Sequence, residues 1–268
     1  MKQTSRTTRV TIGLLLCCMA IINAENVERE FGPRLKKGIA LFDSAYNAWN
    51  DSLFLEAYAH FSKMQRSFPA QYFPRYWQGV VSFYLVSYTL FGLPEDRDQK
   101  AAALYVAQAL DALNEALELK PGDAEALALL GTLKGIKIYL NPLLAPVLGP
   151  QVMNAIERAL EAGPDNPRVY YLVGVSYYNT PSFLGGGAAK GLDYLLKAHE
   201  LFAGEAKRPD NPLSPDWGYS TCLAFIGKVY MSEKEYEKAR IWFNNALVVN
   251  PQDKLAKRGI RELARIAP

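Results

Sequence analysis

The chain has little of what catalytic and metal sites are usually built from. It contains two histidines, His60 and His199, and three cysteines in 268 residues. The histidines do not form a His-x-x-x-His pair, which would place two metal ligands on one face of a helix. No Gly-x-Ser-x-Gly sequence marks the nucleophile of a hydrolase. We therefore expect no metal, no cofactor and no catalytic residues, and we expect the chain not to be an enzyme.

Sustained alternation of apolar and polar residues is also absent, so the sequence predicts no β-sheet. An excess of basic charge is missing once the first 24 residues are set aside. Those residues hold Lys2, Arg6 and Arg9 and no acidic side chain, so 27 of the 30 basic residues remain, against 27 acidic ones. A neutral chain without a basic stripe lacks the electrostatic signature of nucleic-acid binding. We expect no nucleic-acid partner.

The N-terminal 24 residues are typical of a secretory signal peptide. Three basic residues precede a short apolar segment from Ile12 to Ile22, and Ala24 offers a small residue for cleavage. The apolar segment is shorter than the roughly 20 residues that span a bilayer. Lipid attachment at Cys17 or Cys18, or an uncleaved anchor, are the alternatives, and membrane contact is expected only in those two cases. The protein is thus expected to be exported to the periplasm.

A pattern of about 34 residues begins and ends the remaining chain. Large residues recur where two helices would face each other, small ones where they would cross, and a proline follows the second helix. Near the C-terminus these positions are Leu223, Ile226, Gly227, Tyr230, Ala239, Phe243, Ala246 and Pro251. Near the N-terminus they are Leu41, Ala45, Ala57, Phe61, Met64 and Pro69. The pattern returns three times in between with insertions, and Gly79, Gly131 and Gly174 fill the small crossing positions.

This pattern resembles the tetratricopeptide (TPR) repeat, a helix–turn–helix unit that stacks into a solenoid. The resemblance implies an all-α fold of five helix pairs with insertions and a C-terminal capping helix. The expected divisions are a signal peptide (1–24), a polar leader (25–37), four repeats with insertions (38–206), a linker (207–219), and the fifth repeat with the capping helix (220–268).

Two of the insertions are unusual. Residues 140–150 form an apolar stretch, which we expect to be a loop that packs on a neighbouring insertion, a partner or a membrane. The other contains Thr180, Pro181, Phe183, Gly185 and Gly186. It resembles a turn found in exported bacterial TPR proteins, among them the T-component lipoproteins of TRAP transporters. That resemblance implies association with a transporter.

In TPR proteins, fixed positions of each first helix line the concave face. Here these positions are aromatic in repeats one, two and four, and they predict a partner- or ligand-binding groove made of Phe42, Tyr46, Trp49, Tyr76, Phe83, Tyr84, Tyr171 and Tyr178. An aromatic stripe of this size is a binding site unless the chain fills it. The leader and residues 140–150 are the segments that we consider for filling it.

The leading functional hypothesis is a non-catalytic envelope protein that binds a protein partner through this groove. The alternative is a periplasmic carrier of a small lipophilic or organic-acid ligand, associated with a transporter. An open groove would favour the first hypothesis and a closed pocket the second.

Overall fold

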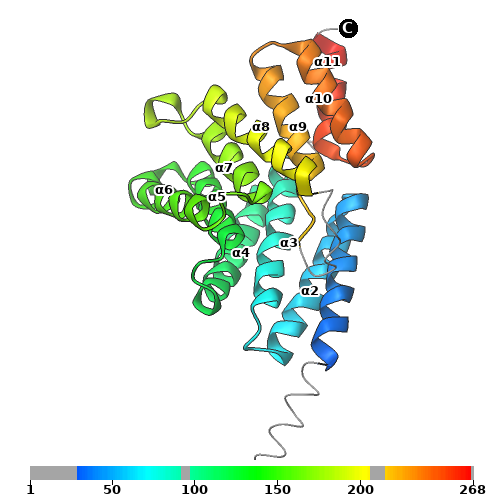
Figure 1. Ribbon diagram of the computed structural model, residues 1–268, viewed down its shortest axis with the longest axis vertical. Helices are drawn as coiled ribbons and strands as arrows, with labels where there is room; N and C mark the ends of the chain where they lie inside the picture. The colour runs from blue at the N-terminus through cyan, green and yellow to red at the C-terminus, as the bar shows by residue number, and fades with distance from the viewer. Residues whose placement is uncertain (1–28, 92–96, 206–214, 267–268) are drawn as a thin grey trace, which may run out of the picture.

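The computed structural model describes residues 29–91, 97–205 and 215–266, and every regular element in these ranges is helical. The expected signal peptide lies outside the described residues. Figure 1 shows the helices following one another as antiparallel pairs around a curved stack. None of the described helices combines the length and the apolar character needed to cross a membrane.

An N-terminal helix (29–48) precedes the numbered elements. The remaining α-helices are α2 (Asp51–Ser67), α3 (Tyr72–Phe91), α4 (Gln99–Leu119), α5 (Ala124–Leu140), α6 (Ala145–Ala162), α7 (Pro167–Asn179), α8 (Ala188–Glu205), α9 (Tyr219–Ser232), α10 (Tyr236–Val249) and α11 (Lys254–Ile266). Short 3-10 helices, η2 (Pro142–Leu144) and η3 (Ser182–Leu184), lie in the α5–α6 and α7–α8 turns. The all-α, TPR-like architecture expected from the sequence is confirmed, with α11 packed on α9 and α10 as the capping helix.

The small residues of the repeat pattern stand where paired helices touch. A Cβ added at Gly79 would lie 2.6 Å from the Leu113 side chain, and one at Gly174 would lie 3.0 Å from the backbone of Gly191. A Cβ at Gly227 would meet the Phe243 ring at 2.8 Å. Glycine at these crossings lets the two helices of each repeat approach closely.

Polar caps begin the helices where the sequence predicts them. The Asp123 side chain accepts a hydrogen bond from the Ala126 amide at 3.0 Å, and Asp253 accepts one from the Ala256 amide at 3.0 Å. These bonds satisfy amides that a helix cannot pair internally. The proline-containing turns therefore define the repeat boundaries by local chemistry.

Two of the insertions are largely helical. The insertion of repeat two mainly lengthens its helices, since α3 has 20 residues and α4 has 21. The apolar stretch 140–150 was expected to be a loop, but α6 begins at Ala145 and continues through Pro150. The start of the helix has a local reason: Asn141 caps η2 through the Leu143 amide, and Pro146 stands in the first turn of α6, where proline is tolerated. Pro150 lies inside the helix.

The solenoid curves enough for its first and last repeats to touch. The segment that leads into α9 runs between α3 and the N-terminal helix (Figure 1). Asp216 in this segment lies near Asp43 of the N-terminal helix. Burial raises the pKa of Asp43 to about 6, and the charge of Asp216 adds to this effect.

We predict that Gly259→Ala destabilises the fold by about 1–3 kcal/mol, because overpacking of a core costs this much. The added Cβ would lie 2.2 Å from the Phe243 ring. Gly135→Ala is the matched control, because nothing lies within 4 Å of its added Cβ. Within helix α5 it should stabilise the protein by about 0.5–1 kcal/mol. Denaturant unfolding of both variants measures the difference, and equal midpoints would contradict this account of the helix crossing.

We also predict that Asp43→Asn makes the protein less sensitive to pH between about pH 4 and pH 7. The pKa of Asp43 is raised from 3.8 to about 6 in the folded chain, so its protonation favours folding and wild-type stability gains as the pH falls through 6. Burial raises the pKa of Glu125 and Asp253 as well. Their effect is common to both proteins and cancels in the difference between the two melting curves. Parallel curves for wild type and variant would refute the assignment.

Candidate functional site

The eight aromatic residues predicted to line the groove lie mostly inside the protein. Six are buried, and only Tyr46 and Tyr178 are half-buried. Five of them belong to one cluster, Phe42, Tyr46, Trp49, Phe83 and Tyr84, in which neighbouring rings lie 5.2–6.3 Å apart. Tyr171 packs against Phe225, and Tyr178 stands apart below the Lys228 ammonium. The concave positions therefore converge, but as a core instead of an open stripe.

Trp217, which the sequence prediction did not include, fills this concave face. Its ring centroid lies 6.0 Å from that of Tyr84 and 6.4 Å from that of Phe83. Its indole Nε1 donates a hydrogen bond to the Tyr76 hydroxyl at 3.0 Å. Gly218 follows at φ 104°, a left-handed conformation that favours glycine and turns the chain into α9. The filling segment is thus neither the leader nor residues 140–150, the two that the sequence suggested. In the sequence, a tryptophan next to a proline-rich linker was the signal that could have indicated this filling segment.

A second contact joins the first repeat to the last. The Tyr46 hydroxyl shares a hydrogen bond of 2.5 Å with the Ser220 hydroxyl and one of 3.1 Å with that of Thr221. Ser220 in turn donates to the buried Asp253 carboxylate at 3.0 Å. Burial raises the pKa of Tyr46 to about 12, and the charge of Asp253 adds to the rise. Tyr46 therefore acts as a neutral hydrogen-bonding group that closes the concave face.

A buried polar network lies next to Trp217 and contacts the segment that carries it. Arg168 of α7, only 2% exposed, pairs with the Glu205 carboxylate at 2.9 Å and lies 3.8 Å from that of Glu125. It also donates to the backbone carbonyl of Pro215. The Tyr76 hydroxyl donates to Glu125, which also accepts from Asn166 at 2.8 Å. This network ties three repeats to the segment that carries Trp217.

The charges in this network stabilise one another. Burial lowers the pKa of Arg168, but the carboxylates of Glu125 and Glu205 more than offset it, so the pKa is raised. Burial raises the pKa of Glu125 against the opposing effects of Arg168 and Tyr76. Glu125 and Arg168 stand at the same position of the first helix in successive repeats. That pairing of opposite charges was a readable signal that sequence reasoning did not use.

A pocket of about 500 Å³ opens beside this network, and no predicted site residue except Tyr76 borders it. It lies where the start of α3 meets the α4–α5 and α6–α7 turns. Its walls are formed by Tyr72, Phe73, Tyr76, Lys120, Gly122, Asp123, Ala124, Glu125, Ala162, Gly163, Asn166 and Pro215. The pocket thus combines three aromatic rings with a few polar groups, the composition typical of small-ligand sites.

Tyr72 and Lys120 dominate the pocket wall. The Lys120 ammonium lies 5.3 Å above the Tyr72 ring and 2.8 Å from the Asp123 carboxylate. The Tyr72 hydroxyl is buried and makes no hydrogen bond of standard geometry. Burial raises its pKa, and the nearby Asp123 raises it further. The Tyr72 side chain is therefore a neutral phenol beside the Asp123 carboxylate.

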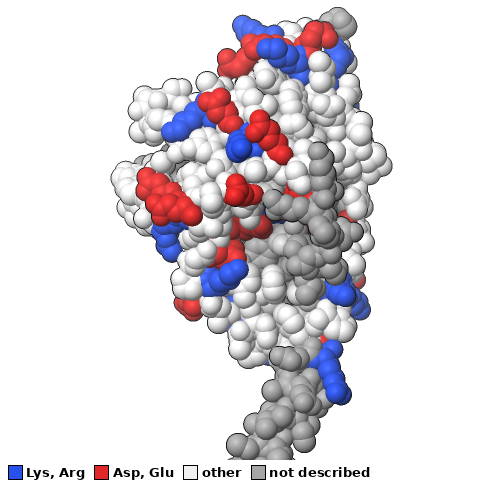
Figure 2. Space-filling view, viewed as in Figure 1, with Lys and Arg blue, Asp and Glu red and all other residues white. Residues whose placement is uncertain are grey.

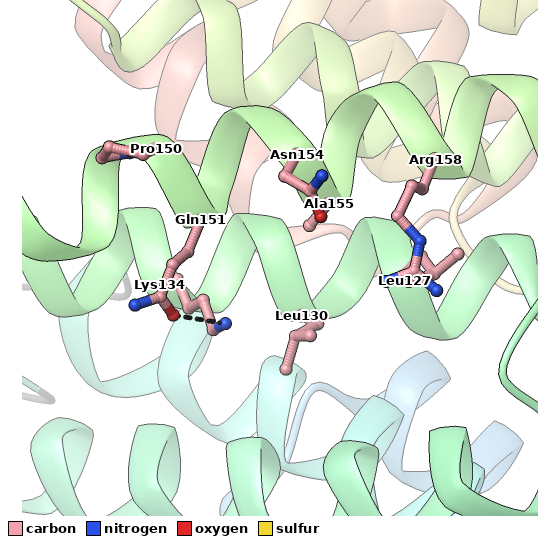
Figure 3. A pocket seen from close by; sticks show the side chains of 8 residues that line it. All are labelled: Leu127, Leu130, Lys134, Pro150, Gln151, Asn154, Ala155 and Arg158. Atoms are coloured by element: carbon pink, nitrogen blue, oxygen red, sulfur yellow. Dashed lines mark hydrogen bonds between the residues drawn. The ribbon is translucent and has the colours of Figure 1, made fainter.

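A shallower pocket of about 290 Å³ lies between α5 and α6. Figure 3 shows Lys134 and Gln151 joined across it by a hydrogen bond of 2.8 Å, with Arg158 at the opposite end. The Arg158 guanidinium donates to the Pro121 carbonyl at 3.0 Å. The lining carries two cations and no acidic residue, but it lacks an aromatic wall.

The histidines and the remaining cysteine form no reactive group. The His60 ring contacts the Arg34 carbonyl at 2.8 Å, and the His199 ring contacts the Tyr219 hydroxyl at 3.2 Å. Cys222 is buried, and burial raises the pKa of its thiol. Within the described ranges no three His, Cys, Asp or Glu residues are grouped to hold a metal ion.

Comparison with known proteins gives a likeness of fold. No family model matches the chain, and no curated protein matches it. Among solved structures, the HusA haemophore from Porphyromonas gingivalis is similar, with a TM-score of 0.55 and 22% identity over 75% of this chain and 94% of that one. YrrB, a TPR protein with an unusual peptide-binding site, gives a TM-score of 0.39 and 16% identity over 89% of this chain and 97% of YrrB. The first likeness shows that this helical arrangement is shared with a haemophore.

Proposed function

We propose that this protein is a non-catalytic carrier that binds a small, largely apolar ligand in the pocket at the start of α3. The observation that carries the proposal is the division of the concave side. Trp217 fills the aromatic groove, and a pocket of about 500 Å³ remains beside it. A scaffold for a protein partner needs an open groove, whereas a carrier needs an enclosed site. The volume lies within the usual range of small-molecule sites.

The pocket wall favours a flat apolar ligand with an acidic group. Tyr72 and Phe73, with ring centroids 5.5 Å apart, offer an aromatic surface to the ligand body. Lys120 and the Tyr72 hydroxyl are the groups that a carboxylate would meet. Lys120 already pairs with Asp123, so a ligand carboxylate would have to share the Lys120 ammonium with it. The ligand class is therefore a lipophilic organic acid.

Haem is the first such compound to test, because the similar HusA is a haemophore and haem is a flat apolar ring with carboxylates. Tyrosinate is one of the protein ligands of haem iron. Burial and Asp123 raise the pKa of Tyr72, which disfavours the tyrosinate form. The pocket would hold the ring by apolar contact instead of by an iron ligand. Metal-free protoporphyrin should then bind about as tightly as haem.

The alternative, a protein partner in the concave groove, requires Trp217 to leave its place. The proposed carrier works in the periplasm, to which the signal peptide expected in residues 1–24 would export it. A carrier in that compartment would deliver its ligand to a transporter or receptor.

We predict that Phe73→Ala weakens the binding of protoporphyrin by about tenfold or more. Loss of a ring that becomes desolvated on binding costs about 1.5–3 kcal/mol, and 1.4 kcal/mol corresponds to a tenfold change. The measurement is a fluorescence titration with protoporphyrin, and in parallel with haem. Phe183→Ala is the matched control, because Phe183 is 86% exposed and borders neither pocket. No binding by wild type, or equal loss in both variants, would rule out this pocket.

We predict that Trp217→Ala lowers the free energy of unfolding by about 3–5 kcal/mol, the usual cost of removing a large buried ring. Trp217→Phe should cost less, because it keeps most of the ring and loses only the hydrogen bond to Tyr76. Denaturant unfolding distinguishes the two variants. If Trp217→Ala left stability unchanged and opened the groove to peptides, the protein-partner hypothesis would replace the carrier proposal.

A further inference from the structure

Exposed apolar side chains gather on one edge of the solenoid, and none of them borders the aromatic pocket at the start of α3. In and around the α5–α6 turn, Leu143 is 87% exposed, and Val147 and Tyr139 are each 65% exposed. In the α7–α8 turn, Phe183 is 86% exposed and Leu184 is 62% exposed. We call this set the apolar edge. Large side chains in surface turns are normally polar, because such turns face water.

The two turns lie side by side because α5 and α7 occupy the same place in successive repeats. The hydroxyls of Thr132 and Ser176 are 3.2 Å apart, which aligns the two helices at that level. Tyr139 follows Thr132 by seven residues, and Phe183 follows Ser176 by the same number. Figure 1 shows both turns projecting to the left of the stack. The apolar residues of the two turns therefore form two separate tips on the same edge of the stack.

The chain segments that form the apolar edge carry only basic charge, although acidic groups lie next to them on the surface (Figure 2). Residues 126–156 and 166–192 contain no aspartate or glutamate, although the whole chain has 27 acidic residues. Lys134, Lys137 and Lys190 lie in these two ranges and are not buried. Figure 2 shows the projecting α7–α8 turn as uncharged surface. Burial lowers the pKa of Lys134, and Lys137 lowers it further. An anionic surface would relieve that repulsion.

Several backbone amides of the tips are paired within the turns themselves. The Leu143 amide donates to the Asn141 side chain at 3.3 Å, and the Leu184 amide donates to the Pro181 carbonyl at 2.9 Å. The Gly187 amide donates to the Tyr177 carbonyl at 2.9 Å. A segment can enter the apolar region of a bilayer only when its backbone amides are paired internally. The amides named here are paired in this way, while the Leu143 and Leu184 side chains are exposed.

We propose that the apolar edge docks on an anionic lipid surface. Leu143, Val147, Phe183 and Leu184 would enter the headgroup boundary. Lys137 would face the lipid phosphates, and Lys134 and Lys190 would have to exchange their contacts with Gln151 and the Tyr177 ring to do the same. Apolar side chains flanked by lysines are the usual composition of segments that lie in the membrane interface. A second copy of the chain fits less well, because a symmetric pairing of this edge would bring lysines against lysines. The inference is independent of the ligand pocket.

The test is sedimentation of the full-length protein with lipid vesicles. Two vesicle types are used, phosphatidylcholine alone and phosphatidylcholine with phosphatidylserine. The double variant L143S/F183S should bind the anionic vesicles at least tenfold more weakly than wild type. Val248→Ser is the matched control, because Val248 is 82% exposed on α10 and outside the apolar edge. The apolar segment Ile12–Ile22 is common to all these proteins, so its contribution cancels in the comparison.

A second double variant, K134Q/K137Q, should reduce the preference for anionic vesicles and its salt dependence. Equal binding of wild type and L143S/F183S would overturn the proposal, as would equal binding to both vesicle types. Lipid-free self-association that is lost in L143S/F183S would overturn it in favour of a second copy as the occupant. A protein partner would be indicated if vesicle binding were absent in wild type.

Discussion

The guanidinium of Arg168 is the interaction on which the arrangement of the concave side depends. It pairs with Glu205 of α8, lies near Glu125 of α5, and donates to the Pro215 carbonyl. Its charge also lies 6.0 Å from the centroid of the Trp217 ring. A buried cation without partners would be costly, so the surrounding groups are held where they can pair with it. The position of Trp217, and with it the closure of the groove, follows from this constraint.

Because the groove is closed, the aromatic positions of the first helices and the open pocket lie in different parts of the molecule. The aromatic residues of the first helices become the core that joins repeat one to repeat five. A pocket remains at the turns between repeats, where Tyr72 and Phe73 border it. The opposite edge, formed by the turns within repeats, carries Leu143 and Phe183 in water. A ligand site and a docking surface can therefore occupy different edges of the same stack.

The fold could be predicted because its signals are local. The crossing glycines, such as Gly79 and Gly227, and the capping residues Asp123 and Asp253 act within one repeat or one turn. The lengths of the inserted helices were missed, since apolar stretches with proline near their start can be either loop or helix. The candidate site was predicted only as a set of helix positions. Its closure depends on Trp217, which lies 141 residues from its hydrogen-bond partner Tyr76.

The sequence by itself determined the helices, their pairing and which side of each first helix is aromatic. Helical periodicity decides these features, because it needs only residues within a few turns of one another. The tertiary structure alone decided what meets that aromatic side. A helix face of Phe, Tyr and Trp can contact solvent, a partner or the same chain, and its own residues do not distinguish among them. Here the curvature of the stack brings residues 215–218 onto that face, so the chain fills its own groove.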